Sequence, residues 1–157
     1  FQKGKVSADI QGFLRHNENG LMNFHDWKDK LTYLPYFDFL KPMRQKRDPH
    51  RSDDRRAAAK QLYEWGAKEI LISHNSEMLV YDGKDYYTCP VKARNLSGRT
   101  GRGDTTFGAY LAKRMMGVSI PDALLFATAA VSLKMETPGP LQGPEQAVLD
   151  YIKEFYA

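Results

Sequence analysis

Short apolar runs alternate along this chain with longer segments of helical pattern, and this alternation constrains the fold more than any other feature. Strand-like runs lie at residues 5–10, 36–40 and 68–73, while residues 52–65 and 145–155 have the pattern of helices. Strands that alternate with helices favour an α/β fold, in which helices flank a mainly parallel sheet.

The segments between these elements carry turn and helix-end signals. A loop is predicted at residues 12–20 and a helix at residues 25–34, which the next residue, a proline, would end. The Asp-Gly pair at residues 82–83, between two apolar runs, predicts a hairpin. Further helices are predicted at residues 104–116 and from Ser119 onward, and the second of these has the small, apolar composition of a buried helix.

Composition narrows the class of protein. The chain has 157 residues, enough for one domain with its own core, and its 42% hydrophobic content is ordinary for a globular protein. The single cysteine, Cys89, excludes an internal disulfide and fits a reducing, cytoplasmic setting, and neither it nor the histidines show zinc-ligand spacing. The apolar runs are too short for a membrane span, and the first residues show neither an initiator Met nor a signal peptide. We therefore expect no membrane partner, and the start of the chain suits a fragment.

The segment with the strongest chemical signal is a glycine-rich loop that runs into a helix. Gly98, Gly101 and Gly103 allow tight turns and close backbone approach to a ligand, and Asp104 follows in the first helical turn. Free N–H groups at such a helix start favour an anion, and a neighbouring carboxylate can accept a proton from an attacking hydroxyl. A plain glycine loop with a capping Asp is the alternative. The spacing matches neither a P-loop nor a dinucleotide fingerprint.

The loop resembles the signature of a known family. Gly101-Arg102-Gly103-Asp104-Thr105 is similar to the Gly-Ala-Gly-Asp-Thr motif of ribokinase-like (PfkB) carbohydrate kinases. Segments similar to other parts of these kinases follow one another in the right order, at residues 6–15, 66–73, 81–83 and 119–124. The resemblance covers nearly the whole chain and implies a three-layer ribokinase-like fold.

The resemblance also implies an activity. Kinases of this family transfer the γ-phosphoryl group of ATP, with Mg²⁺, to a hydroxyl group of a sugar or a related small molecule. Asp104 matches the catalytic base, and the backbone of Gly101, Arg102 and Gly103 matches the anion hole; Arg102 and Asp104 would also contact the substrate. No side chain is assigned as a metal ligand. The positions that match the nucleotide site are Ser73, Asn75, Ser76, Glu77, Arg99, Thr100, Ala127, Ala130 and Val131.

In two respects the chain lacks parts that the family pattern includes. Family members are about twice as long, so residues 1–157 correspond to the C-terminal, nucleotide-binding part, without the acceptor-binding half and the lid. The fragment alone is expected to be inactive, and a homodimer of the full-length protein is left open. The family's Asn-x-x-Glu motif should fall near residues 43–46, where Met43-Arg44-Gln45-Lys46 has no carboxylate. This favours the alternative of a catalytically silent relative that binds a nucleotide.

A third departure lies within the loop itself. The family often has Asp-Thr-Thr where this chain has Gly98-Arg99-Thr100, and that aspartate helps to hold a monovalent cation. Arg99 could supply a fixed positive charge instead, which predicts an activity indifferent to potassium. Arg102 stands where the family has a small residue and could contact phosphate or an anionic acceptor. The alternative is that both arginines lie in solvent.

A basic run leaves a rival class open, that of nucleic-acid-binding modules. The net charge is +4, and residues 41–56 concentrate basic side chains. This run lacks interleaved aromatic residues and is diluted by Asp48, Asp53 and Asp54, so a solvated surface is the favoured interpretation, without a nucleic-acid partner. Its basic members are Lys41, Arg44, Lys46, Arg47, His50, Arg51, Arg55 and Arg56.

Overall fold

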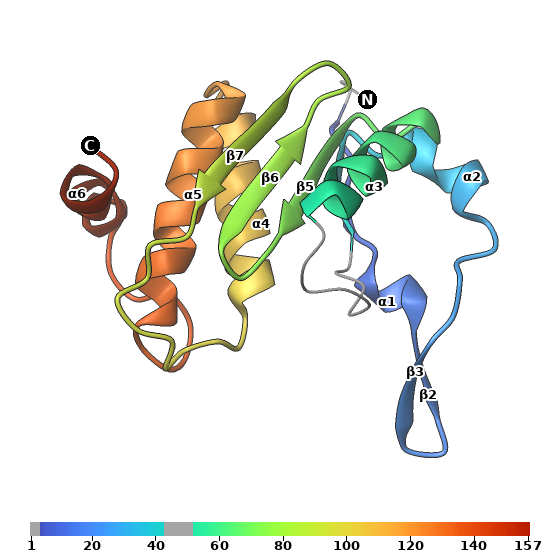
Figure 1. Cartoon of the computed structure of the whole chain (residues 1–157), viewed down its shortest axis with the longest axis horizontal. Helices are drawn as coiled ribbons and strands as arrows, with labels where there is room; N and C mark the ends of the chain where they lie inside the picture. Colours follow the sequence, from blue (N-terminus) through green and yellow to red (C-terminus); the bar gives the residue numbers. More distant parts are fainter. Residues whose placement is uncertain (1–3, 43–51) are drawn as a thin grey trace. The chain divides into compact units, whose positions relative to one another are not determined.

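A computed structural model describes residues 4–42 and 52–157, and Figure 1 shows the course of the chain. Two compact units divide it. The first comprises Phe1–Ile72 and Val80–Tyr86, and the second comprises Ser73–Leu79 and Tyr87–Ala157. Within the described ranges, no helix combines the length and apolar character needed to cross a bilayer.

The main sheet has five strands in the order β1-β4-β5-β6-β7. Its strands are β1 (Ser7–Asp9), β4 (Phe39–Lys41), β5 (Glu69–Ser73), β6 (Glu77–Tyr81) and β7 (Tyr86–Pro90). Strand β4 pairs in parallel with β1 and with β5, with Phe39 opposite Ser7 and Glu69. The predicted α/β fold with a mainly parallel sheet is confirmed, and the predicted Asp-Gly hairpin joins β6 to β7.

The first unit builds its core from β4, β5 and the segments that flank them. Leu40 and Ile70 are fully buried, as expected for strands covered on both faces. Helix α3 (Ser52–Glu64) ends one residue before the predicted bound, and Gly66 follows it with a φ of 109°. A Cβ at residue 66 would lie 2.6 Å from Cγ of Pro35, so close packing as well as backbone conformation requires glycine there.

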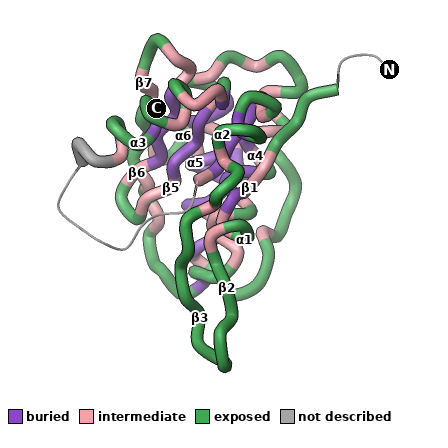
Figure 2. The backbone as a smooth tube through the Cα atoms, turned by 90° about the vertical axis from the view of Figure 1, so that its right-hand side faces the viewer, coloured by how far each residue is buried: buried purple, intermediate pink, exposed green. Residues whose placement is uncertain are grey.

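A two-stranded hairpin replaces the predicted loop at residues 12–20. Strands β2 (Arg15–Glu18) and β3 (Leu21–Phe24) pair antiparallel, after the short helix α1 (Gln11–Leu14). Asn19 and Gly20, with φ values of 54° and 81°, form the turn. Both residues have positive φ, as in the type I′ turns that favour Asn-Gly hairpins. Every residue of both strands is exposed (Figure 2).

The helix predicted at residues 25–34 is wrong over its first half. Only α2 (Lys30–Tyr33) is helical, and it continues as the 3₁₀ turn η1 (Leu34–Tyr36). Trp27 stacks on Phe13 and on Tyr33, with ring centroids 4.7 and 5.9 Å away. Stacking between rings adds to the apolar contact that holds Trp27 outside a helix.

Three helices make up most of the second unit: α4 (Arg102–Met115), α5 (Ile120–Met135) and α6 (Glu145–Phe155). Helix α5 packs against both of the others and is the most buried of the three, as its composition predicts. It begins at Ser119, whose Oγ accepts a hydrogen bond from the backbone N–H of Asp122 at 3.3 Å. Helix α6 covers α5 with Val148 and Tyr151.

The single cysteine lies in the second unit. Cys89 is buried in β7, and this burial raises the pKa of its thiol. A thiol with a raised pKa holds less of the reactive thiolate.

Candidate active site at the glycine loop

The glycine loop leads directly into helix α4, whose first turn has no side-chain cap from the described residues. Gly101 adopts the left-handed conformation, with a φ of 76°, and a Cβ on it would meet nothing within 4 Å. Helix α4 begins directly after it, and the N–H of Thr105 donates the first hydrogen bond of the helix to the carbonyl of Gly101 at 3.0 Å. No side chain in the described part of the chain caps this helix. The N–H of Arg102 donates to the carbonyl of Arg99 at 3.4 Å, whereas the N–H groups of Gly103 and Asp104 have no acceptor among the described residues. These two groups are available to an anion, which the helix dipole also favours.

Asp104 stands in this first turn with its side chain exposed. It forms no hydrogen bond or ion pair with any residue in 4–42 or 52–157. A carboxylate that is not engaged elsewhere can accept a proton from a bound hydroxyl group. A buried salt bridge at Asp104 would have excluded this role.

Arg102 and Asn75 are brought together from two distant parts of the sequence. The guanidinium Nη1 of Arg102 donates to the Asn75 Oδ1 at 2.6 Å. Asn75 lies in the turn between β5 and β6, so this bond ties that turn to the first residue of α4. Both residues are among those predicted for the site.

The turn between β5 and β6 holds the other predicted residues of its segment. Ser76 and Asn75 are exposed, while Ser73 and Glu77 are half-buried at the adjoining strand ends. The backbone of the turn is fixed, because the Ser76 carbonyl accepts from the N–H of Val91 at 2.8 Å. The structure therefore places four of the predicted donor-site residues on one ordered turn.

The remaining predicted contacts fall into two groups. Arg99 and Thr100 are exposed on the glycine loop, where a bound anion could reach them. Ala127, Ala130 and Val131 are fully buried within α5 and offer no surface to a ligand in this structure. Their contact with a nucleotide stays a prediction.

Gly98 forms the base of the loop and is buried against the end of α5. Its N–H donates to the carbonyl of Met135 at 2.7 Å, and its carbonyl accepts from Nζ of Lys134 at 2.6 Å. A Cβ at residue 98 would overlap the carbonyl oxygen of Thr137, so only glycine fits. Sequence reasoning missed Lys134, although a lysine inside a helix of small apolar residues was an available signal.

An ion pair between the exposed Arg94 and the largely buried carboxylate of Glu136 holds the chain just before the loop. Glu136 accepts from Nε of Arg94 at 2.8 Å and from the hydroxyl of Tyr151 at 2.8 Å. The hydrogen bond from Arg94 is the main reason that the pKa of Glu136 falls from 4.5 to about 2. Ser97, the residue before Gly98, donates to the backbone carbonyl of Glu136 at 2.6 Å. This network thus fixes the start of the loop from the end of α5.

Metal ligands are not gathered at this site. The described ranges contain no group of three or more His, Cys, Asp or Glu side chains placed to hold a metal ion. The predicted departure at Met43–Lys46 lies outside the described residues. Magnesium therefore stays a prediction from the family resemblance, and none of the steps below passes through it.

The basic run of the rival interpretation is only partly within the described residues. Lys41 is buried and forms an ion pair with Asp9. The guanidinium of Arg56 lies over the ring of Tyr86, 5.1 Å from its centroid. Because Lys41 and Arg56 already interact with residues of this chain, less positive charge is available to bind the phosphates of a nucleic acid. Arg55 is also described, whereas Arg44, Lys46, Arg47, His50 and Arg51 lie outside the described residues.

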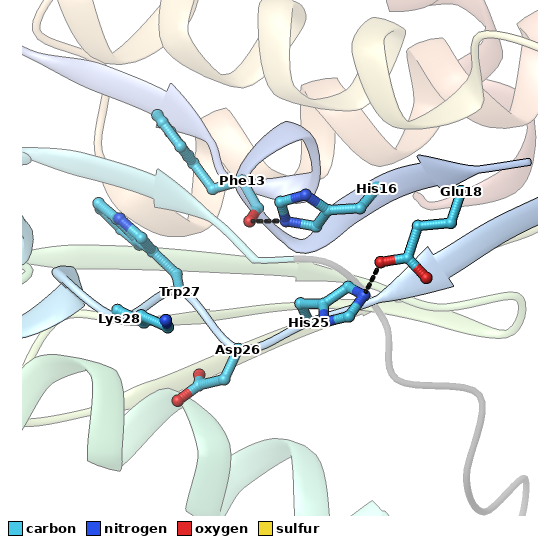
Figure 3. A pocket seen from close by; sticks show the side chains of 7 residues that line it. All are labelled: Phe13, His16, Glu18, His25, Asp26, Trp27 and Lys28. Atoms are coloured by element: carbon cyan, nitrogen blue, oxygen red, sulfur yellow. Dashed lines mark hydrogen bonds and ion pairs between the residues drawn. The ribbon is translucent and has the colours of Figure 1, made fainter.

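A separate shallow pocket of about 310 Å³ lies in the first unit, beside the base of the β2–β3 hairpin. His16, Glu18, His25 and Trp27 are among its lining residues (Figure 3). Nε2 of His25 lies 2.7 Å from Glu18, whose pKa is lowered mainly by a hydrogen bond from Asn23. None of these residues was predicted for a site.

Comparison with known proteins finds ribokinase-family kinases. No family model matches the chain. A cytidine kinase of Thermococcus kodakarensis is 36% identical over 64 residues, which are 39% of this chain and 23% of that protein. A solved pyrophosphate-dependent kinase of the ribokinase family, in complex with a pyrophosphate analogue and myo-inositol, is 38% identical, with a TM-score of 0.81 over 93% of this chain and 53% of its own. Over nearly its whole length, the chain therefore resembles kinases of the ribokinase family in fold and in sequence.

Other solved ribokinase-like proteins resemble the chain in the same way. A pyrophosphate-dependent myo-inositol kinase with altered specificity is 36% identical, with a TM-score of 0.82 over 98% of this chain and 55% of its own. The ribokinase-like chain thus spans about half the length of the solved relatives it matches. An Arabidopsis thaliana ribokinase is 22% identical, with a TM-score of 0.69 over 78% of this chain and 43% of its own, and shows the fold alone.

Proposed function

We propose that the protein carrying this chain transfers a phosphoryl group to a hydroxyl group of a sugar or polyol. The observation that carries the proposal is the uncapped first turn of α4, beside an exposed Asp104 that no described residue engages. A polyol is the leading acceptor, because a relative that is 38% identical was solved with myo-inositol.

The site residues would act in two ways. Asp104 accepts the proton of the acceptor hydroxyl group while the oxygen of that hydroxyl attacks the terminal phosphorus of the donor. The backbone N–H groups of Gly101, Arg102 and Gly103 stabilise the charge on the phosphoryl group in transit, while the bond to the leaving phosphate breaks. Because the N–H groups are fixed by the helix, little reorganisation is needed during the reaction.

Two donors are candidates. The resemblance to the family predicts ATP, whereas relatives that are 36% and 38% identical are pyrophosphate-dependent kinases. The burial of Ala127, Ala130 and Val131 favours pyrophosphate, because these residues were predicted to line a nucleotide site. Pyrophosphate needs only the anion-binding part of the site, which the exposed loop and the turn at Asn75 supply.

The test is a matrix of donors and acceptors with the full-length protein. ATP and pyrophosphate are each offered with myo-inositol, ribose and cytidine, and phosphorylated products are measured. We expect turnover of a polyol with pyrophosphate. Binding of donor without any turnover would instead support the catalytically silent relative.

The Asp104→Asn substitution tests the role of the base. It should lower kcat by about 10²- to 10⁴-fold, the usual contribution of general-base catalysis. Asp122→Asn is the matched control, since Asp122 is also an exposed aspartate in the first turn of a helix. Its kcat should stay within about twofold of the parent protein, because it lies outside the proposed machinery. A D104N variant with unchanged kcat would remove Asp104 from the mechanism.

A further inference from the structure

The most unusual charged group of the second unit is the ammonium of Lys134. Only 1% of this residue is exposed, and its Nζ donates to the carbonyl of Gly98 at 2.6 Å. Across residues 4–42 and 52–157, no carboxylate forms an ion pair with it. A buried cation without a counter-charge is costly, so this position calls for negative charge nearby.

Two sources of negative charge lie near this ammonium. The last turn of α5, in which Lys134 lies, carries the negative end of its helix dipole. The second source is the anion that the proposed function places at the start of α4, on the same loop that the ammonium contacts at Gly98. A lysine under the loop can therefore serve both the loop and its ligand.

The packing at Gly98 excludes the other common way to place a cation there. The aspartate that the family pattern has at this position does not fit here, because any Cβ at residue 98 overlaps the carbonyl oxygen of Thr137. The Gly98 N–H is also engaged, by the carbonyl of Met135 at 2.7 Å. Residue 98 therefore has no side chain that could hold a cation, and the ammonium of Lys134 is the cation that contacts its carbonyl.

We propose that Lys134 is a built-in cation of the phosphate site, a positioning residue that fixes Gly98 and makes the reaction independent of alkali-metal ions. The proposal rests on the proposed phosphoryl transfer. It replaces Arg99 as the source of fixed charge, because Arg99 is exposed and Lys134 is buried in direct contact with the loop.

Two substitutions of Lys134 separate charge from packing. Lys134→Met keeps most of the volume and removes the charge, whereas Lys134→Ala leaves a cavity beside the Gly98 carbonyl that a small cation can enter. Lys113→Met is the matched control, because the side chain of Lys113 is only 12% exposed and pairs with Glu145 within the same unit. Kinetics are measured on the full-length protein, with potassium, ammonium, methylammonium or tetramethylammonium as the monovalent cation.

The expected results form a pattern. The parent protein should keep its kcat when tetramethylammonium replaces potassium. Both Lys134 variants should lose about 10- to 100-fold in kcat, less than the loss of a direct anion-hole donor, with the acceptor KM little changed. Potassium, ammonium or methylammonium should restore the kcat of K134A and leave the lowered kcat of K134M unchanged. K113M should behave as the parent.

Three results would overturn the proposal: a parent protein that requires potassium, a K134M variant with parental kcat, or a K134A variant that no cation restores. Binding of inorganic pyrophosphate, measured by calorimetry, provides a readout without turnover. It should weaken about tenfold in K134M, because the fixed positive charge beneath the loop is lost, and stay unchanged in K113M. If the parent turns over no donor, the proposed function fails, and the calorimetric comparison still decides the role of Lys134. If K134M does not fold, recovery of the melting temperature of K134A by methylammonium tests the same point.

Discussion

The glycine loop at residues 97–103 and the β2–β3 hairpin are both short polar excursions of the backbone, but they are held in place by different means. The loop is anchored at its base by Gly98, with both backbone groups bonded to the end of α5. The hairpin is exposed along its whole length and is held by its own ladder and an Asn-Gly turn. One segment depends on tertiary contacts, and the other on local ones.

This difference indicates where precise geometry is required. A phosphate site acts through preorganised N–H groups, so a loop that presents them has to be fixed by its surroundings. Buried polar contacts such as those of Gly98 and Glu136 supply that rigidity and make their sites intolerant of change. An exposed ribbon has few such contacts, so its sequence is free to vary.

Of the substitutions that test this comparison, one at Gly98 should change the free energy of unfolding most. Gly98→Ala should lower the free energy of unfolding by about 3 kcal/mol or more, because the new Cβ overlaps the carbonyl of Thr137. The control is Gly101→Ala, where the Cβ meets nothing within 4 Å and only the positive φ is unfavourable, at about 1 kcal/mol. Urea unfolding measures both. Equal losses would mean that the base of the loop is no more constrained than its tip.

A smaller effect is expected at Glu136, with a defined pH dependence. Glu136→Gln should cost about 1–3 kcal/mol of stability at pH 7, because it removes the charged acceptor of the hydrogen bonds from Arg94 and Tyr151. The folded-state pKa of Glu136 lies near 2, below the ordinary 4.5, so this stabilisation is complete above pH 4.5 and is lost as the pH falls toward 2. The difference between parent and variant in urea unfolding should shrink over that range. Glu154→Gln, at an exposed position of α6, should show no such trend.

The smallest effect is expected in the hairpin. Met22→Ser should change the free energy of unfolding by less than about 0.5 kcal/mol, because 56% of Met22 is already exposed. Thermal unfolding of the isolated chain and of the full-length protein measures it. A loss above about 1 kcal/mol in the full-length protein alone would mean that another part of that protein covers the hairpin.

Much of the fold and part of the site could be predicted because their signals are local. Ser119 marks the start of α5, and Gly101 to Asp104 mark the uncapped start of α4 through their own backbone preferences. The β2–β3 hairpin was missed although Asn19-Gly20 is a strong hairpin signal, because its strands lack a clear alternation of polar and apolar residues. The contact of Lys134 with Gly98 joins residues 36 positions apart, and only tertiary structure brings them together.

The burial of Cys89 affects how well the protein withstands an oxidising environment. Its thiol is buried, and the raised pKa keeps it in the unreactive protonated form. Oxidants can reach the sulfur only when this part of the molecule opens, so resistance to oxidation is set by folding stability rather than by the redox state of the surroundings. A lone cysteine in such a place therefore says little about the compartment in which the protein works.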